Sequence, residues 1–111
     1  MVTIADFLEY DFDNPHIWDK FEEFALLAAS RRKHFGVGAV MERIRWYTEI
    51  EANRDDYKVN NNWRAFYARK FALKYPEHAG FFRCRESVAD GLSCSDFTAD
   101  WRPVYFASGR E

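Results

Sequence analysis

The sequence predicts a mainly α-helical (α+β) domain, with a three-helix core and a short two-stranded ribbon of the winged helix-turn-helix type. Apolar residues recur at helical spacing in three stretches, residues 14–33, 37–52 and 61–75. Two short runs rich in aromatic and β-branched residues, 57–59 and 81–85, flank the last stretch and predict the ribbon. With 111 residues, of which 48% are hydrophobic and 19% aromatic, the chain is long enough for one packed domain.

The chain divides into three predicted parts. Residues 1–13 form an acidic, aromatic N-terminal arm that docks on the domain or makes a short helix, and residues 14–85 form the winged-helix-like domain. Residues 86–111 form an irregular C-terminal extension that packs on the domain through aromatic anchors. Because no run of about 18 uncharged apolar residues and no signal peptide is present, we expect a soluble cytoplasmic protein with no membrane partner.

The first two helices are predicted from capping and periodicity. Asn14 and Pro15 suit the N-cap and first turn of a helix that reaches about Lys33. Its apolar stripe consists of Ile17, Phe21, Phe24, Leu27 and Ala28. In the second helix one face holds Val37, Val40, Met41, Ile44 and Tyr47 or Thr48, and Trp46 and Ile50 lie on a neighbouring flank. We therefore expect the second helix to be packed on more than half of its circumference.

The third helix carries the candidate site. The asparagines at 60–62 are expected to stop the first strand and to cap this helix, and Pro76 ends it. Its buried side consists of Trp63, Phe66, Tyr67 and Phe71. From the same periodicity we expect Arg64, Arg69 and Lys70 to lie mostly on the solvent-exposed, open side of this helix.

Charge is divided along the chain. Residues 1–23 carry seven acids and one base, a net charge of −6, whereas residues 24–88 carry thirteen Lys or Arg and seven acids, a net charge of +6. A basic middle between acidic ends is the footprint of an anionic partner, although such blocks are also often solvated faces.

The sequence carries no pattern typical of an active site. Adjacent carboxylates such as Asp55 and Asp56 point apart, and no serine-hydrolase, zinc-protease or phosphate-loop motif is present. His16, His34 and His78 are scattered without the spacing of zinc ligands. We therefore expect a protein that is not an enzyme and has neither a metal nor a cofactor. Cys84 and Cys94 are expected to be free thiols.

Nucleic-acid binding, with DNA preferred over RNA, is the leading functional hypothesis. A winged helix-turn-helix presents the N-terminal side chains of its last helix to a DNA groove. The residues predicted to contact nucleic acid are Lys58, Asn61, Asn62, Arg64, Arg69 and Lys70. The asparagines and Arg64 are of the types that read adenine and guanine edges, and the other cations would contact phosphates.

Two alternatives stay open. The aromatic content exceeds what one small core readily hides, and Trp, Tyr and Arg dominate protein interfaces, so the chain could bind a protein or form a homodimer. In a purely structural interpretation the asparagines only cap the helix. Its basic residues then pair with Glu42, Glu49 or the acidic N-terminal arm.

Four short motifs follow one another in the central part of the chain: RIRW at 43–46, NNN at 60–62, YAR at 67–69 and YPEHAGFF at 75–82. This ordered set resembles a family of small, largely uncharacterised proteins of bacteriophage and prophage genomes. The resemblance implies a phage-type nucleic-acid-binding accessory or regulatory protein in the cytoplasm of a bacterial host cell. Its alternative implication is an inhibitor or adaptor that binds a bacterial host protein, for example a host-defence or anti-CRISPR-type inhibitor.

Overall fold

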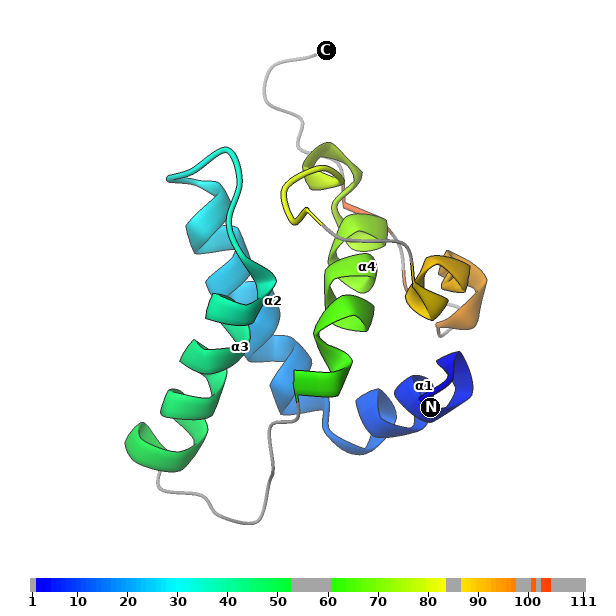
Figure 1. Cartoon of the computed structure of the whole chain (residues 1–111), viewed down its shortest axis with the longest axis horizontal. Helices are drawn as coiled ribbons and strands as arrows, with labels where there is room; N and C mark the ends of the chain where they lie inside the picture. Colours follow the sequence, from blue (N-terminus) through cyan, green and yellow to red (C-terminus); the bar gives the residue numbers. More distant parts are fainter. Residues whose placement is uncertain (1, 53–60, 84–86, 98–100, 102, 105–111) are drawn as a thin grey trace.

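The structure, a computed structural model, describes residues 2–52, 61–83, 87–97, 101, 103 and 104. In these residues the chain is mainly helical, as the sequence predicts (Figure 1). The α-helices are α1 (Ile4–Asp13), α2 (Pro15–Ala29), α3 (Val37–Trp46) and α4 (Arg64–Lys74). A π-helical turn, η1 (Tyr47–Glu51), continues α3. The 3₁₀ turns are η2 (Asn61–Trp63), η3 (Pro76–His78), η4 (Val88–Gly91) and η5 (Cys94–Asp96).

The N-terminal arm is a capped helix. Thr3 accepts a hydrogen bond from the backbone N–H of Asp6, whose carboxylate accepts one from the backbone N–H of Thr3, so both ends of a capping box are made. Asn14 separates α1 from α2, and Pro15 opens α2 as predicted. The Asn14 side chain does not cap α2, because its amide donates to the carbonyl of Tyr10 at 2.9 Å and closes α1 instead.

Helix α2 ends four residues before the predicted Lys33. The hydroxyl of Ser30 donates to the carbonyl of Leu27 at 2.6 Å, and this local bond replaces the next helical turn. Ile17 and Phe21 are buried as predicted, but Leu27 is 55% exposed although it belongs to the predicted apolar stripe. The basic residues 31–34 therefore lie in the connection to α3 and not on a helix.

Helix α3 buries the predicted face and leaves its other side open. Val40, Met41 and Ile44 are almost completely buried against the neighbouring helices. Trp46 and Ile50 are more than half exposed, so the expectation that this helix is packed on more than half of its circumference is wrong. Figure 1 shows the reason, since α3 lies at the outer side of the bundle with α2 and α4 on one side of it.

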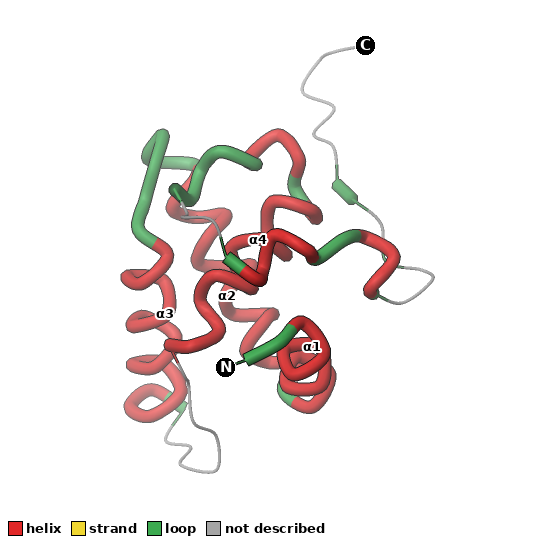
Figure 2. The backbone as a smooth tube through the Cα atoms, turned by 45° about the vertical axis from the view of Figure 1, so that its right-hand side comes forward, coloured by secondary structure: helices red, strands yellow, loops and turns green. Residues whose placement is uncertain are grey.

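The described residues contain no strand, so the winged helix-turn-helix arrangement has no support in them (Figure 2). The first predicted strand, 57–59, lies outside the described residues. In the second, Phe81 and Phe82 are buried in the core. Phe82 forms an isolated parallel bridge with Phe35, and the backbone N–H of Phe35 donates to the carbonyl of Phe81 at 3.4 Å. Burial of the Phe81 and Phe82 rings and backbone pairing with Phe35 thus hold this segment against the α2–α3 connection.

The core extends beyond the three predicted helices. Phe7 of α1 is fully buried, with its ring centre 5.1 Å from those of Phe66 and Tyr67 of α4. In the C-terminal extension, Ala89 and Leu92 are buried in the same cluster. Residues from both ends of the chain are therefore buried in the core, and α1 is a full member of it. Cys94 is an exposed free thiol, and Cys84 lies outside the described residues.

Candidate interaction surfaces

The six residues predicted to contact nucleic acid have different surroundings. Lys58 lies outside the described residues, and Asn61 begins η2 just before α4. Asn62 and Arg64 are exposed. A guanidinium nitrogen of Arg64 lies 3.7 Å from the position that a Cβ on Gly38 would take, so this side chain extends over the start of α3.

Lys70 is buried, and its predicted place on the open side of the helix is wrong. Its ammonium lies 2.5 Å from the Asp11 carboxylate of α1 and 4.4 Å from the centre of the Trp18 ring. Burial lowers the pKa of Lys70 and Asp11 opposes this shift, while burial raises the pKa of Asp11 against the opposing effect of Lys70. The periodicity contained the signal for this burial, because residue 70 follows the buried Trp63 by seven positions and Phe66 by four.

Arg69 is also engaged within the protein. Its Nε donates to the Asp90 carboxylate at 2.6 Å, and a terminal guanidinium nitrogen contacts the same carboxylate. Asp90 belongs to η4, so this pair ties α4 to the C-terminal extension. Hydrogen bonds from the Ser87 backbone and from Arg69 lower the pKa of Asp90. Carboxylates from both ends of the chain thus neutralise two cations of the predicted recognition helix; the structural interpretation names the N-terminal arm, which holds Asp11, but not Asp90.

An apolar groove lies between α2 and α3, with a volume of about 400 Å³. The residues that line it are Phe24, Leu27, Ala28, Arg31, Arg32, Phe35, Ala39, Val40 and Arg43. Leu27 and Phe35 are 55% and 40% exposed, which makes them unusual among large apolar side chains of the described residues. The groove lies near the end of α2, where Leu27 of the helix and Phe35 of the connection to α3 both line it.

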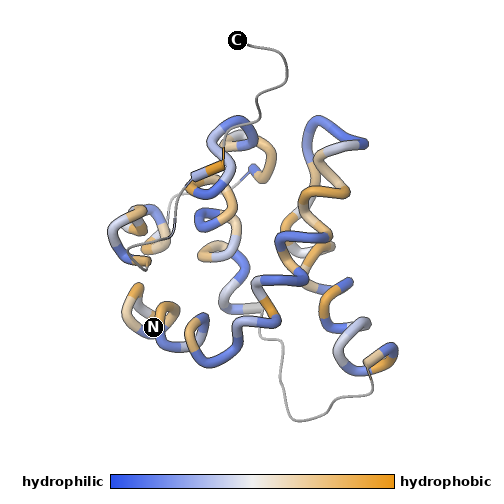
Figure 3. The backbone as a smooth tube through the Cα atoms, turned by 180° about the vertical axis from the view of Figure 1, so that it is seen from behind, coloured by the Kyte–Doolittle hydropathy of each residue, from blue (hydrophilic) through white to orange (hydrophobic). Residues whose placement is uncertain are grey.

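Arginines surround this groove on several sides. Arg43 places its guanidinium carbon 4.6 Å from the centre of the Phe24 ring, and one of its nitrogens lies 3.4 Å from the Glu51 carboxylate. Arg31 and Arg32 form no salt bridge within the described part of the protein. Figure 3 shows the hydrophilic connection between α2 and α3 next to alternating apolar positions of the two helices. The groove therefore combines an apolar floor with uncompensated positive charge.

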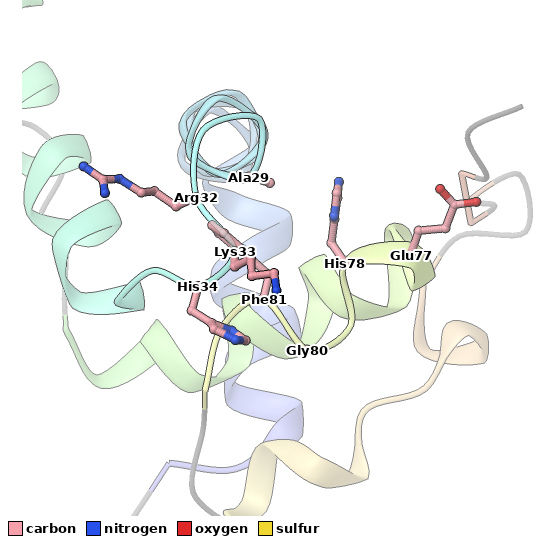
Figure 4. A pocket seen from close by; sticks show the side chains of 8 residues that line it. All are labelled: Ala29, Arg32, Lys33, His34, Glu77, His78, Gly80 and Phe81. Atoms are coloured by element: carbon pink, nitrogen blue, oxygen red, sulfur yellow. The ribbon is translucent and has the colours of Figure 1, made fainter. Parts of the chain in front are cut away.

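A second pocket, of about 360 Å³, lies on the other side of the same connection (Figure 4). It is lined by Ala29, Arg32, Lys33, His34, Glu77, His78, Gly80 and Phe81. In the sequence the basic run 31–34 has two interpretations, an anion-binding cluster and a complement to a helix dipole, of which the second is preferred. The pocket could not be predicted, because residues 77–81 are far from this run in sequence. The two segments meet where the backbone N–H of Phe35 donates to the carbonyl of Phe81.

The described side chains include no cluster of three or more histidine, cysteine or acidic residues that could hold a metal ion. None of the helices in the described ranges is long and apolar enough to cross a membrane.

Comparisons with protein-family models, with curated proteins and with solved structures found no match. The resemblance to small phage and prophage proteins therefore rests on the sequence motifs alone.

Proposed function

We propose that this protein is a binding module that docks an acidic, amphipathic segment of a partner protein in the groove between α2 and α3. The observation that carries the proposal is the exposure of Leu27 and Phe35 in a groove bordered by Arg31, Arg32 and Arg43. This corresponds to the adaptor or inhibitor function expected from an exposed aromatic and arginine surface. If the resemblance to phage proteins holds, the partner is a bacterial host protein.

The shape of the groove suits a short helix. Amphipathic helices bind in apolar grooves through side chains three, four and seven positions apart, and the antiparallel helices α2 and α3 form such a groove between them (Figure 1). Leu27 and Phe35 supply apolar contacts at one end. Trp46 and Ile50 extend the exposed apolar surface along the outer side of α3. Contact with these exposed apolar side chains, above all with the aromatic Phe35 and Trp46, would provide most of the binding free energy.

The charge of the groove selects the partner. Arg31 and Arg32 have no carboxylate partner in the described residues, whereas Arg45 lies 3.4 Å from Glu42 and Lys20 lies 3.0 Å from Glu23. A partner that brings carboxylates to the groove gains bidentate contacts with arginine and accelerated association. A basic or neutral segment would gain neither, so we commit to an acidic partner.

Nucleic-acid binding is the competing function. It was expected from α4, but Lys70 is buried and Arg69 already pairs with Asp90. The cations that remain accessible in the described residues include Arg31 and Arg32, and they line an apolar groove that a phosphate backbone does not fill. These observations favour a protein partner.

The test uses a synthetic helical peptide of about 15 residues with leucines at helical spacing and glutamates elsewhere. We expect it to shift the NMR signals of Leu27 and Phe35, and we expect Leu27→Ala combined with Phe35→Ala to weaken binding about tenfold. Val88→Ala is the matched control, because Val88 is also an exposed apolar residue but lies in η4, away from the groove.

Three outcomes would overturn the proposal. The first is no binding of the acidic peptide, and the second is equal binding of a lysine-substituted peptide. The third is binding of a DNA duplex at the same residues with a steep salt dependence, which would restore the nucleic-acid function. Light scattering completes the test, since self-association abolished by the double substitution would assign the groove to a second copy of the chain.

A further inference from the structure

We propose that the pocket between the α2–α3 connection and η3 binds a phosphomonoester dianion. This site lies on the other side of the α2–α3 connection from the docking groove, shares Arg32 with it and does not depend on its function. The pocket is lined by the consecutive cations and imidazole of Arg32, Lys33 and His34 on one side and by His78 on the other. Its volume of about 360 Å³ lies at the small end of the range of ligand pockets, which suits a small anionic group.

The pocket is held by contacts deep in the fold. Phe81, which lines the pocket, is 4% exposed, and its carbonyl accepts the backbone N–H of Phe35, the residue that follows His34. The ring of His78 stacks on that of Phe71, with centres 6.0 Å apart and planes within 5°. Both walls are therefore fixed relative to the core, as preorganised binding requires.

The charge of the pocket is not balanced from within. In the described residues, Arg32, Lys33 and His34 make no ion pair, although Lys20, Arg43, Arg45, Arg69 and Lys70 each have a carboxylate partner. Glu77 is the single carboxylate among the residues that line the pocket. In Figure 4 it lies at one end, beyond His78, while Lys33 lies in the middle near Phe81. A dianion between Lys33 and His78 would compensate this charge.

The number of donors favours a phosphomonoester over a phosphodiester. A phosphomonoester carries a charge of about −1.5 to −2 at pH 7 and three strong acceptor oxygens, whereas a phosphodiester carries one charge. The ammonium of Lys33 and the two imidazoles can supply donors, whereas the Arg32 guanidinium points away from His78 in Figure 4 and contributes its charge from a greater distance. These donors come from two separate segments of the chain, and a terminal phosphate group offers three acceptor oxygens to them.

The experiment follows the imidazole NMR signals of His34 and His78 at pH 7 during titration with inorganic phosphate at constant ionic strength. We expect saturable shifts that Lys33→Ala weakens about tenfold, the effect of removing one charged donor. Arg45→Ala is the control, because Arg45 lies on α3 and pairs with Glu42. Lys33 is exposed, so its variant should fold, which circular dichroism checks.

The source of the phosphate is tested in parallel arms. Phenyl phosphate should bind as inorganic phosphate does if a phosphomonoester is the ligand, and dimethyl phosphate should bind much more weakly. Equal binding of dimethyl phosphate and of a short oligonucleotide would overturn the proposal in favour of a phosphodiester backbone. Shifts that are linear, are reproduced by chloride or persist unchanged in Lys33→Ala would overturn it entirely. None of these outcomes changes the peptide test of the groove, which uses different residues.

Discussion

The ammonium of Lys70 lies 2.5 Å from the carboxylate of Asp11, in a pair that joins α4 to α1 across 59 positions of sequence. Both residues are at most 9% exposed, and the pair lies beside the Trp18 and Phe97 rings. Removing one partner of a buried ion pair leaves an uncompensated charge in the core. This pair therefore makes the stability of the fold sensitive to single substitutions and to pH.

Lys70→Met should lower the free energy of unfolding by about 3–5 kcal/mol at pH 7.5, since Asp11 is then buried without its cation. The deficit should shrink as pH falls. Burial already raises the pKa of Asp11, and loss of Lys70 removes the opposing effect, so the folded variant binds a proton more tightly than the unfolded chain. The Lys70→Met variant then loses stability as pH rises from about 4, the usual pKa of Asp, through the higher pKa that Asp11 has in the folded variant.

Urea denaturation at pH 4.5 and 7.5 measures this dependence. Asp11→Asn combined with Lys70→Met should be less destabilised at pH 7.5 than Lys70→Met alone, because no charge remains buried. A deficit of equal size at both pH values would show that Asp11 is not the group left uncompensated.

Phe7→Ala should destabilise the protein by about 3–5 kcal/mol, because Phe7 is fully buried against α4. Phe12→Ala is the matched control in the same helix. Its side chain is 83% exposed, so the change should stay within about 0.5 kcal/mol. Thermal unfolding of the three proteins measures both effects. Similar small losses in both variants would mean that α1 is not part of the cooperative core.

Thr48→Val should stabilise the protein by about 1 kcal/mol. Thr48 is 1% exposed, and its hydroxyl has no hydrogen-bond partner in the described residues, so it carries an uncompensated desolvation penalty. Valine keeps the shape and removes the polar group. Thr48→Ser is the control, since it keeps the hydroxyl and loses the methyl group, and it should be destabilising. A loss of stability in Thr48→Val, measured by urea denaturation, would indicate that the hydroxyl finds a partner.

The buried faces of the helices could be predicted from spacing, because packing follows the helical period. Val40, Met41 and Ile44 on α3 and Phe66 and Phe71 on α4 are buried as the period requires. The same reasoning was applied wrongly to Lys70. It was expected on the open side of the helix with Arg64 and Arg69, yet its position is on the buried side, where a distant carboxylate makes its burial possible.

The surfaces could not be predicted, because they depend on where α2 ends and on pairing between distant segments. The hydroxyl of Ser30 bonds to the Leu27 carbonyl where α2 ends, before the basic run, and the Leu27 side chain is exposed there. The basic pocket requires Phe35 and Phe81 to pair, a contact over 46 positions that no periodicity reveals. The groove and the basic pocket both depend on tertiary contacts, which the sequence does not show. The nucleic-acid hypothesis therefore placed the functional charges on α4 instead.

Gly91 reports on docking of the C-terminal extension against α1. A Cβ at this position would lie 2.8 Å from Cδ1 of Ile4, so Gly91→Ala forces the end of that side chain to move and should destabilise the protein by about 1 kcal/mol. Ile4→Val removes the clashing carbon. In that background Gly91→Ala should be less destabilising, with a coupling energy of at least about 0.5 kcal/mol in a double-mutant cycle. Gly80→Ala is the control, because a Cβ there would meet nothing within 4 Å. Additive effects of the two substitutions at 91 and 4 would show that the extension does not contact α1 in solution.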